Sequence, residues 1–271
     1  MNIGICIRHV HQDMRGQFIR AKDSGFAHVQ LVSWEPDLWT AQEAENLTSI
    51  LQETGMTITA FWCGWEGPKE WNFYQGPETL GLVPPSYRHV RVKNLIDGAN
   101  FALKLGVDDV VSHMGFIPEA PSDPHYSGLV AALRFVAGHL KKQGQSLLFE
   151  TGQETPVTLL RCFEDIGTDN LFVNLDPANL VMYDKANPVD AMDTFGSLVR
   201  GVHAKDGLYP VNGQQLGLEV KVGAGKVDFP RLIEKLKEQG YDGSLTIERE
   251  IKGEQQQKDI LAAKEYLQTL L

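Results

Sequence analysis

The chain has 271 residues, of which 42% are hydrophobic and 22% are charged, and its formal net charge is −10. This composition is typical of a globular protein with a large core, and the length suits either two domains or one α/β barrel. A negative charge without any block of lysine and arginine disfavours nucleic acid and anionic membranes as partners. No apolar run reaches the length of a signal-peptide core or a membrane span, so we expect a cytoplasmic protein.

Short apolar runs rich in β-branched residues alternate with amphipathic patterns along the whole chain. Such runs are typical of buried parallel strands. They predict eight strands, over residues 3–7, 28–32, 57–61, 109–113, 146–150, 171–176, 199–203 and 244–248. Helical patterns cover residues 12–24, 41–53, 87–105, 126–143, 155–166, 188–195, 229–239 and 255–271. Eight alternations with no linker between them predict a single (β/α)8 TIM barrel domain over residues 1–271.

Four of the predicted strands end on an acidic residue or a histidine: Glu150, Asp176, His203 and Glu248. Because the C-terminal ends of barrel strands meet at one face, we expect these side chains to lie together. Taken singly, each is more simply explained as a hydrogen-bonded residue at the rim, but four at successive strand ends favour a metal site. Three carboxylates and one imidazole without a thiolate favour Mn²⁺, with Mg²⁺, Co²⁺ or Zn²⁺ as alternatives.

A divalent ion held between two glutamates indicates a particular chemistry. If the ion chelates the carbonyl and hydroxyl oxygens of an α-hydroxy ketone, it acidifies the C–H group between them and stabilises an enediolate. A glutamate on each face can then remove and return the proton. The product of this reaction is an epimer or a ketose/aldose isomer.

The residues around these positions resemble the xylose isomerase-like TIM-barrel superfamily, in the branch that includes D-tagatose 3-epimerase and L-ribulose-5-phosphate 3-epimerase. The motifs are Phe-Glu-Thr-Gly-Gln-Glu, Asn-Leu-Asp-Pro-Ala-Asn, Val-His-Ala-Lys-Asp and Thr-Ile-Glu. The resemblance implies that the four residues ligate one divalent metal and that Glu150 and Glu248 form the acid/base pair. Asn179 stands where these epimerases often carry a substrate-contacting histidine, and Tyr209 stands where they commonly carry an arginine.

Further residues are predicted to bind the substrate: Trp62, His113, Gln153, Asn179 and Lys205. His113 ends the fourth predicted strand, which points its imidazole toward the same face of the barrel. Lys205 follows His203 by two residues, so its side chain is expected on the same side of the strand, where it could neutralise an enediolate or a phosphate. The alternative is that it pairs with Asp206 or Glu219. Trp62 begins an aromatic loop, and an indole ring suits the C–H face of a sugar.

Two other segments of the sequence are open to more than one interpretation. Trp71, Phe73 and Tyr74 in the aromatic loop are expected to form a lid or a contact between the subunits of a dimer or tetramer. Gly223 and Gly225 precede a predicted helix whose N-terminus could hold a phosphate, or they simply shape the turn.

The leading interpretation is a divalent-metal-dependent isomerase or epimerase of a ketose or related keto sugar. A lyase or dehydratase acting on a keto-polyol is an alternative, because the same enolate can expel a β-hydroxyl group. A barrel that binds metal or sugar without catalysis is a third. The endonuclease branch of the superfamily is disfavoured, because it needs more histidine ligands and a basic groove. The sequence leaves open which sugar is bound and whether it is phosphorylated.

Overall fold

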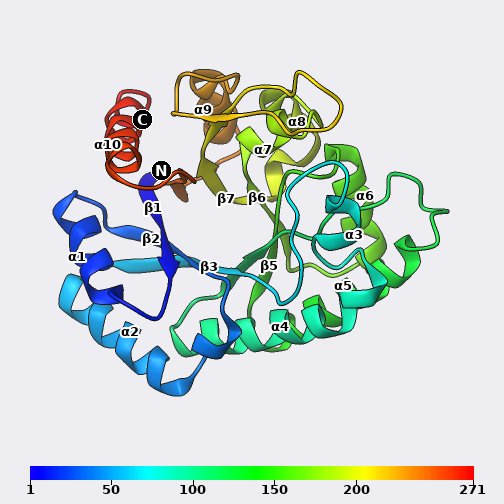
Figure 1. The fold of residues 1–271 in the computed structure, drawn as a ribbon, viewed down its shortest axis with the longest axis horizontal. Coiled ribbons are helices and arrows are strands. Elements are labelled where there is room, and N and C mark those ends of the chain that lie inside the picture. The colour runs from blue at the N-terminus through cyan, green and yellow to red at the C-terminus, as the bar shows by residue number, and fades with distance from the viewer.

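The computed structural model describes residues 1–271 and contains a closed barrel of eight parallel strands (Figure 1). Around the barrel the strands follow the order β1-β10-β7-β6-β5-β4-β3-β2. Their bounds are β1 (Asn2–His9), β2 (His28–Ser33), β3 (Thr57–Cys63), β4 (Asp109–Ser112), β5 (Ser146–Glu150), β6 (Leu171–Leu175), β7 (Val199–Ala204) and β10 (Ser244–Ile247). The predicted α/β fold, a (β/α)8 TIM barrel, is therefore confirmed.

The helices surround the barrel as an outer ring (Figure 1). Each predicted helix is present: α1 (Met14–Asp23), α2 (Ala41–Thr54), α4 (Pro85–Lys104), α5 (Tyr126–Lys142), α6 (Pro156–Ile166), α8 (Pro188–Phe195), α9 (Phe229–Glu238) and α10 (Glu254–Gln268). Local signals define several of their starts. The side chains of Thr40, Thr155 and Asp228 each accept a first-turn N–H of the helix that follows. None of the helices is long and apolar enough to cross a membrane.

The sequence did not predict several short elements, most of which follow the C-terminal ends of strands. They are α3 (Gly76–Thr79), α7 (Pro177–Met182), the two-stranded sheet of β8 (Asp206–Gly207) with β9 (Glu219–Val220), and two 3₁₀ turns (Pro36–Leu38 and Gly196–Leu198). Such segments are too short to show a hydrophobic period. They elaborate the end of the barrel at which the candidate site lies.

Side-chain alternation determines which strand residues point into the barrel. The Gln30 amide on β2 donates to the Asn174 amide oxygen on β6 at 3.2 Å, and these strands are not neighbours, so both side chains lie inside. Gly201 on β7 leaves room for Asn174, because a Cβ there would collide with the Asn174 oxygen. Since residues two apart on a strand share a face, Asp176 and His203 also point inward from the strand ends.

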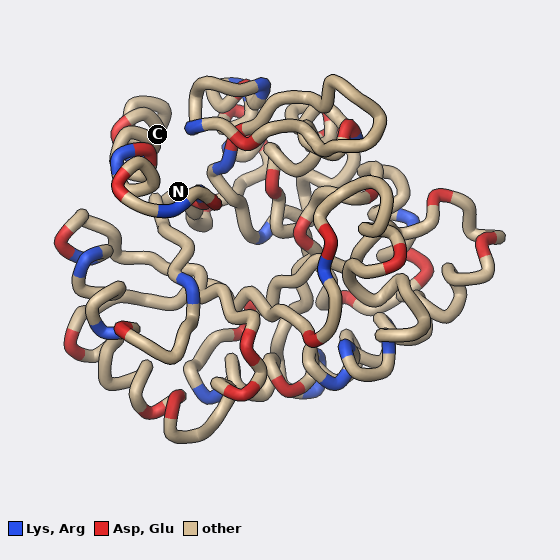
Figure 2. The backbone as a smooth tube through the Cα atoms, in the orientation of Figure 1, with Lys and Arg blue, Asp and Glu red and all other residues tan.

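The charged residues are distributed over the outer ring. Lys and Arg are interspersed with Asp and Glu along the helices (Figure 2). The large hydrophobic core lies between the strands and these helices. A smaller cluster includes Ala60, Trp62, Val111 and Leu148 of β3, β4 and β5. Glu150 follows Leu148 by two residues, which places its carboxylate above this cluster.

Candidate metal centre and active site

Glu150, Asp176, His203 and Glu248 converge at the C-terminal end of the barrel. One ligand atom from each lies within 4.8 Å of the others. The Nδ1 atom of His203 is 3.2 Å from Glu150 Oε1, 3.4 Å from Glu248 Oε2 and 3.6 Å from Asp176 Oδ2. Three of the four are buried, and the Glu248 side chain is 17% exposed. The structure thus brings together the four residues predicted as metal ligands.

A hydrogen bond orients the His203 ring. Its Nε2 lies 2.6 Å from the Gln30 amide oxygen, which can only accept, so Nε2 carries a proton and donates. The Nδ1 atom of neutral His203 therefore presents its lone pair to the carboxylates. Neither this nitrogen nor Asp176 Oδ2 has a hydrogen-bond partner, although both are buried. Four electron-pair donors that face one another, two of them without a hydrogen-bond partner, fit a metal cation.

The pKa shifts of His203 and Asp176 also indicate that this cluster needs positive charge. Burial by itself would lower the pKa of His203, but the carboxylates of Glu150 and Glu248 outweigh it and raise the pKa well above its usual value. Burial raises the pKa of Asp176, partly opposed by Lys205. Without a metal, a proton on His203 would offset part of the negative charge. A divalent cation would do so more completely, and the donor set fits Mn²⁺ or Mg²⁺.

Donors from several elements hold the Glu150 carboxylate. The Trp62 indole N–H donates to Oε2, and the Asn179 amide donates to Oε1 at 3.3 Å. The His113 Nε2 atom lies 3.4 Å from the same Oε1. Burial would raise the pKa of Glu150, but His113 and His203 outweigh it and keep the pKa well below its usual value. Glu150 is therefore an oriented, ionised carboxylate.

Lys205 lies beside Glu248, on the side of β7 that the sequence predicted. Its ammonium group is 3.0 Å from Glu248 Oε2, 2.8 Å from Glu250 Oε2 and 3.7 Å from Asp176 Oδ2. It does not pair with Asp206 or Glu219. Although burial opposes ionisation, Lys205 and His203 lower the pKa of Glu248 to about 2. Both glutamates are thus poised as carboxylates.

A family model described as a xylose isomerase-like TIM barrel matches residues 18–270. The chain belongs to this family. The crystal structure of a xylose isomerase domain protein from Planctomyces limnophilus is 34% identical, with a TM-score of 0.92 over 99% of this chain and 96% of that one. A D-tagatose 3-epimerase-like structure is 20% identical, with a TM-score of 0.77 over 99% and 97%.

A curated relative of this chain is an uncharacterized protein from Methanocaldococcus jannaschii. It is 31% identical over 193 residues, which cover 67% of this chain and 64% of that protein, less than two thirds of its length. More distant structures share the fold at 15–17% identity. They include a 3-keto-D-glucoside 4-epimerase from E. coli, a probable 3-DHS dehydratase from Bacillus anthracis, and a Mycobacterium smegmatis barrel in complex with magnesium.

Tryptophans form one wall beside the candidate centre in this family member. The Trp34 ring lies 4.6 Å from Trp62 and 5.1 Å from Trp65, and Trp71 lies 5.2 Å from the His113 ring. Trp62 is 4% exposed and is tied to Glu150, so it orients a carboxylate, a contact that the sequence did not predict. Trp71 is 38% exposed and lies at the edge of the site.

The Gly223–Gly225 segment is occupied by one of the protein's own carboxylates. Asp206 is fully buried and accepts the backbone N–H groups of Gly207, Gly223, Gly225 and Val227 at 2.8–3.1 Å. A Cβ on Gly225 would collide with this carboxylate. The Asp228 side chain caps the following helix, α9. Of the two interpretations of these glycines, the structure favours the turn, because Asp206 occupies the position that a phosphate would need.

Asp206→Asn is expected to lower the free energy of unfolding by about 3 kcal/mol. Each carboxylate oxygen accepts two backbone N–H groups, and an amide NH₂ cannot accept, so two N–H groups would lose their partner, at a cost of roughly 1–3 kcal/mol each. Urea denaturation measures the change. Asp228→Asn is the matched control, because asparagine caps helices about as well as aspartate and should change stability by less than about 0.5 kcal/mol. Equal losses in both variants would contradict the structural role of Asp206.

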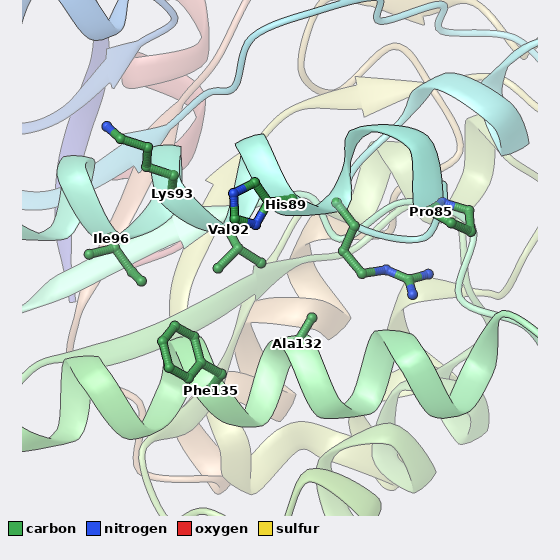
Figure 3. A pocket seen from close by; sticks show the side chains of 8 residues that line it. Pro85, His89, Val92, Lys93, Ile96, Ala132 and Phe135 are labelled. Carbon is green, nitrogen blue, oxygen red and sulfur yellow. The ribbon is translucent and has the colours of Figure 1, made fainter.

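Two surface hollows differ in their relation to the four-residue cluster. A groove of about 620 Å³ between α4 and α5 is lined by residues such as Val92, Ile96 and Phe135 (Figure 3) and contains no predicted site residue. A second hollow, of about 740 Å³, extends between α1 and α10 and reaches Glu248, Arg8 and Trp34. This hollow therefore reaches one residue of the candidate centre, Glu248.

Several residues at the site were not recognised from the sequence. Gln30 orients His203, and Asn174 in turn receives a hydrogen bond from Gln30. Glu154 and Tyr183 lie buried near the ligands. Inward-facing polar residues on apolar strands were a usable signal for Gln30 and Asn174, since a polar side chain inside a barrel needs a partner. Tyr183 follows an element too short to predict, so no sequence pattern placed it.

Proposed function

We propose that this protein is a divalent-metal-dependent isomerase or epimerase that acts on a ketose or a related keto sugar, with Mn²⁺ as the ion. The observation that carries the proposal is the convergence of three carboxylates on the lone pair of His203. The two glutamates come from β5 and β10, which β6 and β7 separate in the barrel. They therefore approach the centre from different sides, as an acid/base pair must.

The chain's own residues supply the proton transfer. A bound divalent ion would polarise the substrate carbonyl and so acidify the neighbouring C–H group. Glu150, held by Trp62 and Asn179, would remove a proton from one face to leave an enediolate, and Glu248 would return a proton to the other face. Lys205, which donates to Glu248 at 3.0 Å, keeps that carboxylate oriented and adds positive charge beside the developing oxyanion.

A second candidate is dehydration of a keto-polyol. One distant structure with the same fold is a probable 3-DHS dehydratase, and an enolate with a β-hydroxyl group can eliminate water. Isomerisation conserves the mass of the substrate, whereas dehydration removes one water. Mass spectrometry of the products therefore distinguishes the two.

Deuterium exchange tests the proposed function. The Mn²⁺-loaded protein is incubated in D₂O with free ketoses, ketose phosphates and 3-keto-glycosides. We expect deuterium to enter one substrate at the carbon next to the carbonyl, with a new epimer or isomer of the same carbon skeleton detected by NMR. Absence of uptake and of any product with every ketone, from protein shown by elemental analysis to hold the metal, would reject the proposed function.

A further inference from the structure

A cluster of buried polar side chains lies beside the candidate centre, and none of them is one of the four candidate metal ligands. Gln153 is 2% exposed, and Glu154 and Tyr183 are each 3% exposed. Both amide atoms of Gln153, one carboxyl oxygen of Glu154 and the Tyr183 hydroxyl have no hydrogen-bond partner within 3.5 Å. The Gln153 amide lies close enough to the Tyr183 hydroxyl to oppose part of the rise that burial causes in its pKa. Buried polar atoms are almost always paired in folded proteins. We refer to these three residues as the polar cluster.

The polar cluster is joined to the ligands by the chain and by packing. Gln153 and Glu154 lie on the loop that follows Glu150, and Tyr183 directly follows α7, whose N-cap is Asp176. A Cβ on Gly152 would be 3.3 Å from Asn179 Cβ, 3.5 Å from His113 Cε1 and 3.6 Å from Tyr183 Cδ2. The loop therefore lies against Asn179 and His113, two of the residues that contact the Glu150 carboxylate.

The polar cluster offers hydrogen-bond donors and acceptors that suit the hydroxyl groups of a ligand. An amide and a phenol each offer a donor and an acceptor. Burial raises the pKa of Glu154 to about 7, partly opposed by His113, so its carboxyl group also becomes a donor near neutral pH. The nearby Lys185 ammonium faces Glu119 at 3.8 Å. Phe73 and Phe116 pack edge-on against Tyr183, with ring centroids at 6.1 and 5.8 Å, and hold its ring in place.

We propose that Gln153, Glu154 and Tyr183 bind hydroxyl groups of the substrate at the end that extends away from the metal ligands. The substrate is then a polyhydroxylated keto sugar that carries no phosphate at that end. This inference rests on the proposed function.

Isosteric variants distinguish a substrate-binding role from a structural one. Removing an unpaired hydroxyl leaves stability unchanged or raises it, whereas removing a paired one lowers it. Tyr183→Phe and Gln153→Leu should therefore melt at the wild-type temperature or above. Tyr126→Phe is the matched control, because the Tyr126 hydroxyl donates to Asp165 at 2.6 Å, and this variant should melt at a lower temperature.

Binding is measured by calorimetry on the Mn²⁺-loaded protein with D-fructose, D-tagatose and D-psicose as probes. We expect Tyr183→Phe and Gln153→Leu to weaken the best-bound ketose about tenfold each, and Tyr126→Phe to leave its affinity unchanged. Glu154→Gln should retain binding within about threefold, because an amide also donates and accepts, whereas Glu154→Leu should lose about tenfold. D-fructose 1-phosphate and D-fructose 6-phosphate should bind no more tightly than D-fructose.

Several results would overturn the inference. Equal ketose affinity in the wild type and in all polar-cluster variants would show that these residues do not contact the substrate. A lower melting temperature of the metal-free Tyr183→Phe variant, similar to that of Tyr126→Phe, would show a structural role. Tighter binding of both phosphate esters would exclude the unphosphorylated class, and failure of every ketose to bind would reject the hydroxyl subsite. Deuterium uptake is scored separately, so the proposed function can stand when the polar cluster is rejected.

Discussion

Glu150→Gln and Glu248→Gln are each expected to slow the interconversion of the keto-sugar substrate and its epimer or isomer by about 10²- to 10⁴-fold. This is the usual contribution of a general acid or base. Glutamine keeps the shape of the side chain and can still offer an oxygen to a metal, but it cannot carry the proton. The rate is measured by NMR at saturating Mn²⁺, and the bound metal is quantified in each variant. Only variants that retain the ion report on proton transfer.

The two variants should also differ from each other in a specific way. If each glutamate serves one face of the substrate, Glu150→Gln still exchanges the C–H proton of one epimer with D₂O, and Glu248→Gln exchanges that of the other. Glu250→Gln is the matched control. Its carboxylate lies 2.8 Å from Lys205 and is 60% exposed, so it shares the neighbourhood but not the ligand cluster. Full turnover by both ligand variants, or a loss in Glu250→Gln as large as in theirs, would contradict the acid/base assignment.

Divalent metal is expected to stabilise the folded protein strongly. Mn²⁺ at about 100 times its Kd adds roughly 2.7 kcal/mol to the free energy of unfolding, which corresponds to a rise in Tm of about 5–10 °C. The physical reason is that the ion neutralises the three clustered carboxylates and binds the lone pair of His203, which faces them. Differential scanning fluorimetry with and without EDTA measures the shift.

The rise in Tm that the metal causes should grow as the pH rises. In the metal-free protein the neighbouring carboxylates raise the pKa of His203 well above its usual value of about 6.5, so protonated His203 stabilises the fold fully below pH 6.5. This contribution is lost as the pH rises through the folded-state pKa, whereas metal binding requires the deprotonated ring and strengthens over the same range. The metal-free Tm should therefore fall in this window, and the Mn²⁺-loaded Tm should fall less.

Two histidine variants locate the ion. His203→Gln should abolish the metal-induced rise in Tm. His11→Gln is the control, because His11 lies 3.1 Å from both Glu35 and Asp37 in an exposed cluster that also has metal-like residue types. That variant should keep the full rise. A rise that survives in His203→Gln but disappears in His11→Gln would place the ion at the surface cluster instead.

Local patterns were sufficient for the barrel and its four candidate ligands. Strands such as β5, in which every residue is buried, are continuous apolar runs, and their ends are marked by the first acidic residue or histidine. Strand ends of a parallel barrel necessarily share a face, so Glu150 and Asp176 had to be close once the fold was known. The prediction that Lys205 shares the side of His203 followed from strand alternation and is confirmed by its contacts with Glu248 and Asp176.

The sequence was less informative about which groups a given side chain or backbone N–H contacts. Trp62 was assigned to sugar stacking from its residue type, but its indole N–H is bonded to Glu150, on a strand not adjacent to its own. The residue types of Gly223 and Gly225 are compatible with a phosphate site. In the structure, however, Asp206 accepts their N–H groups. Each outcome depends on which groups meet in space, and residue spacing carries no such information.

The sequence by itself determined the alternation of eight strands and helices, the inward direction of alternate side chains and the residue types available for a metal. These properties arise from hydrophobic periodicity, which acts over a few residues. Only the tertiary structure decided that His203 turns its lone pair toward three carboxylates, because that orientation comes from Gln30 on a distant strand. It likewise revealed the polar cluster of Gln153, Glu154 and Tyr183, since burial without a partner is a property of the packed barrel.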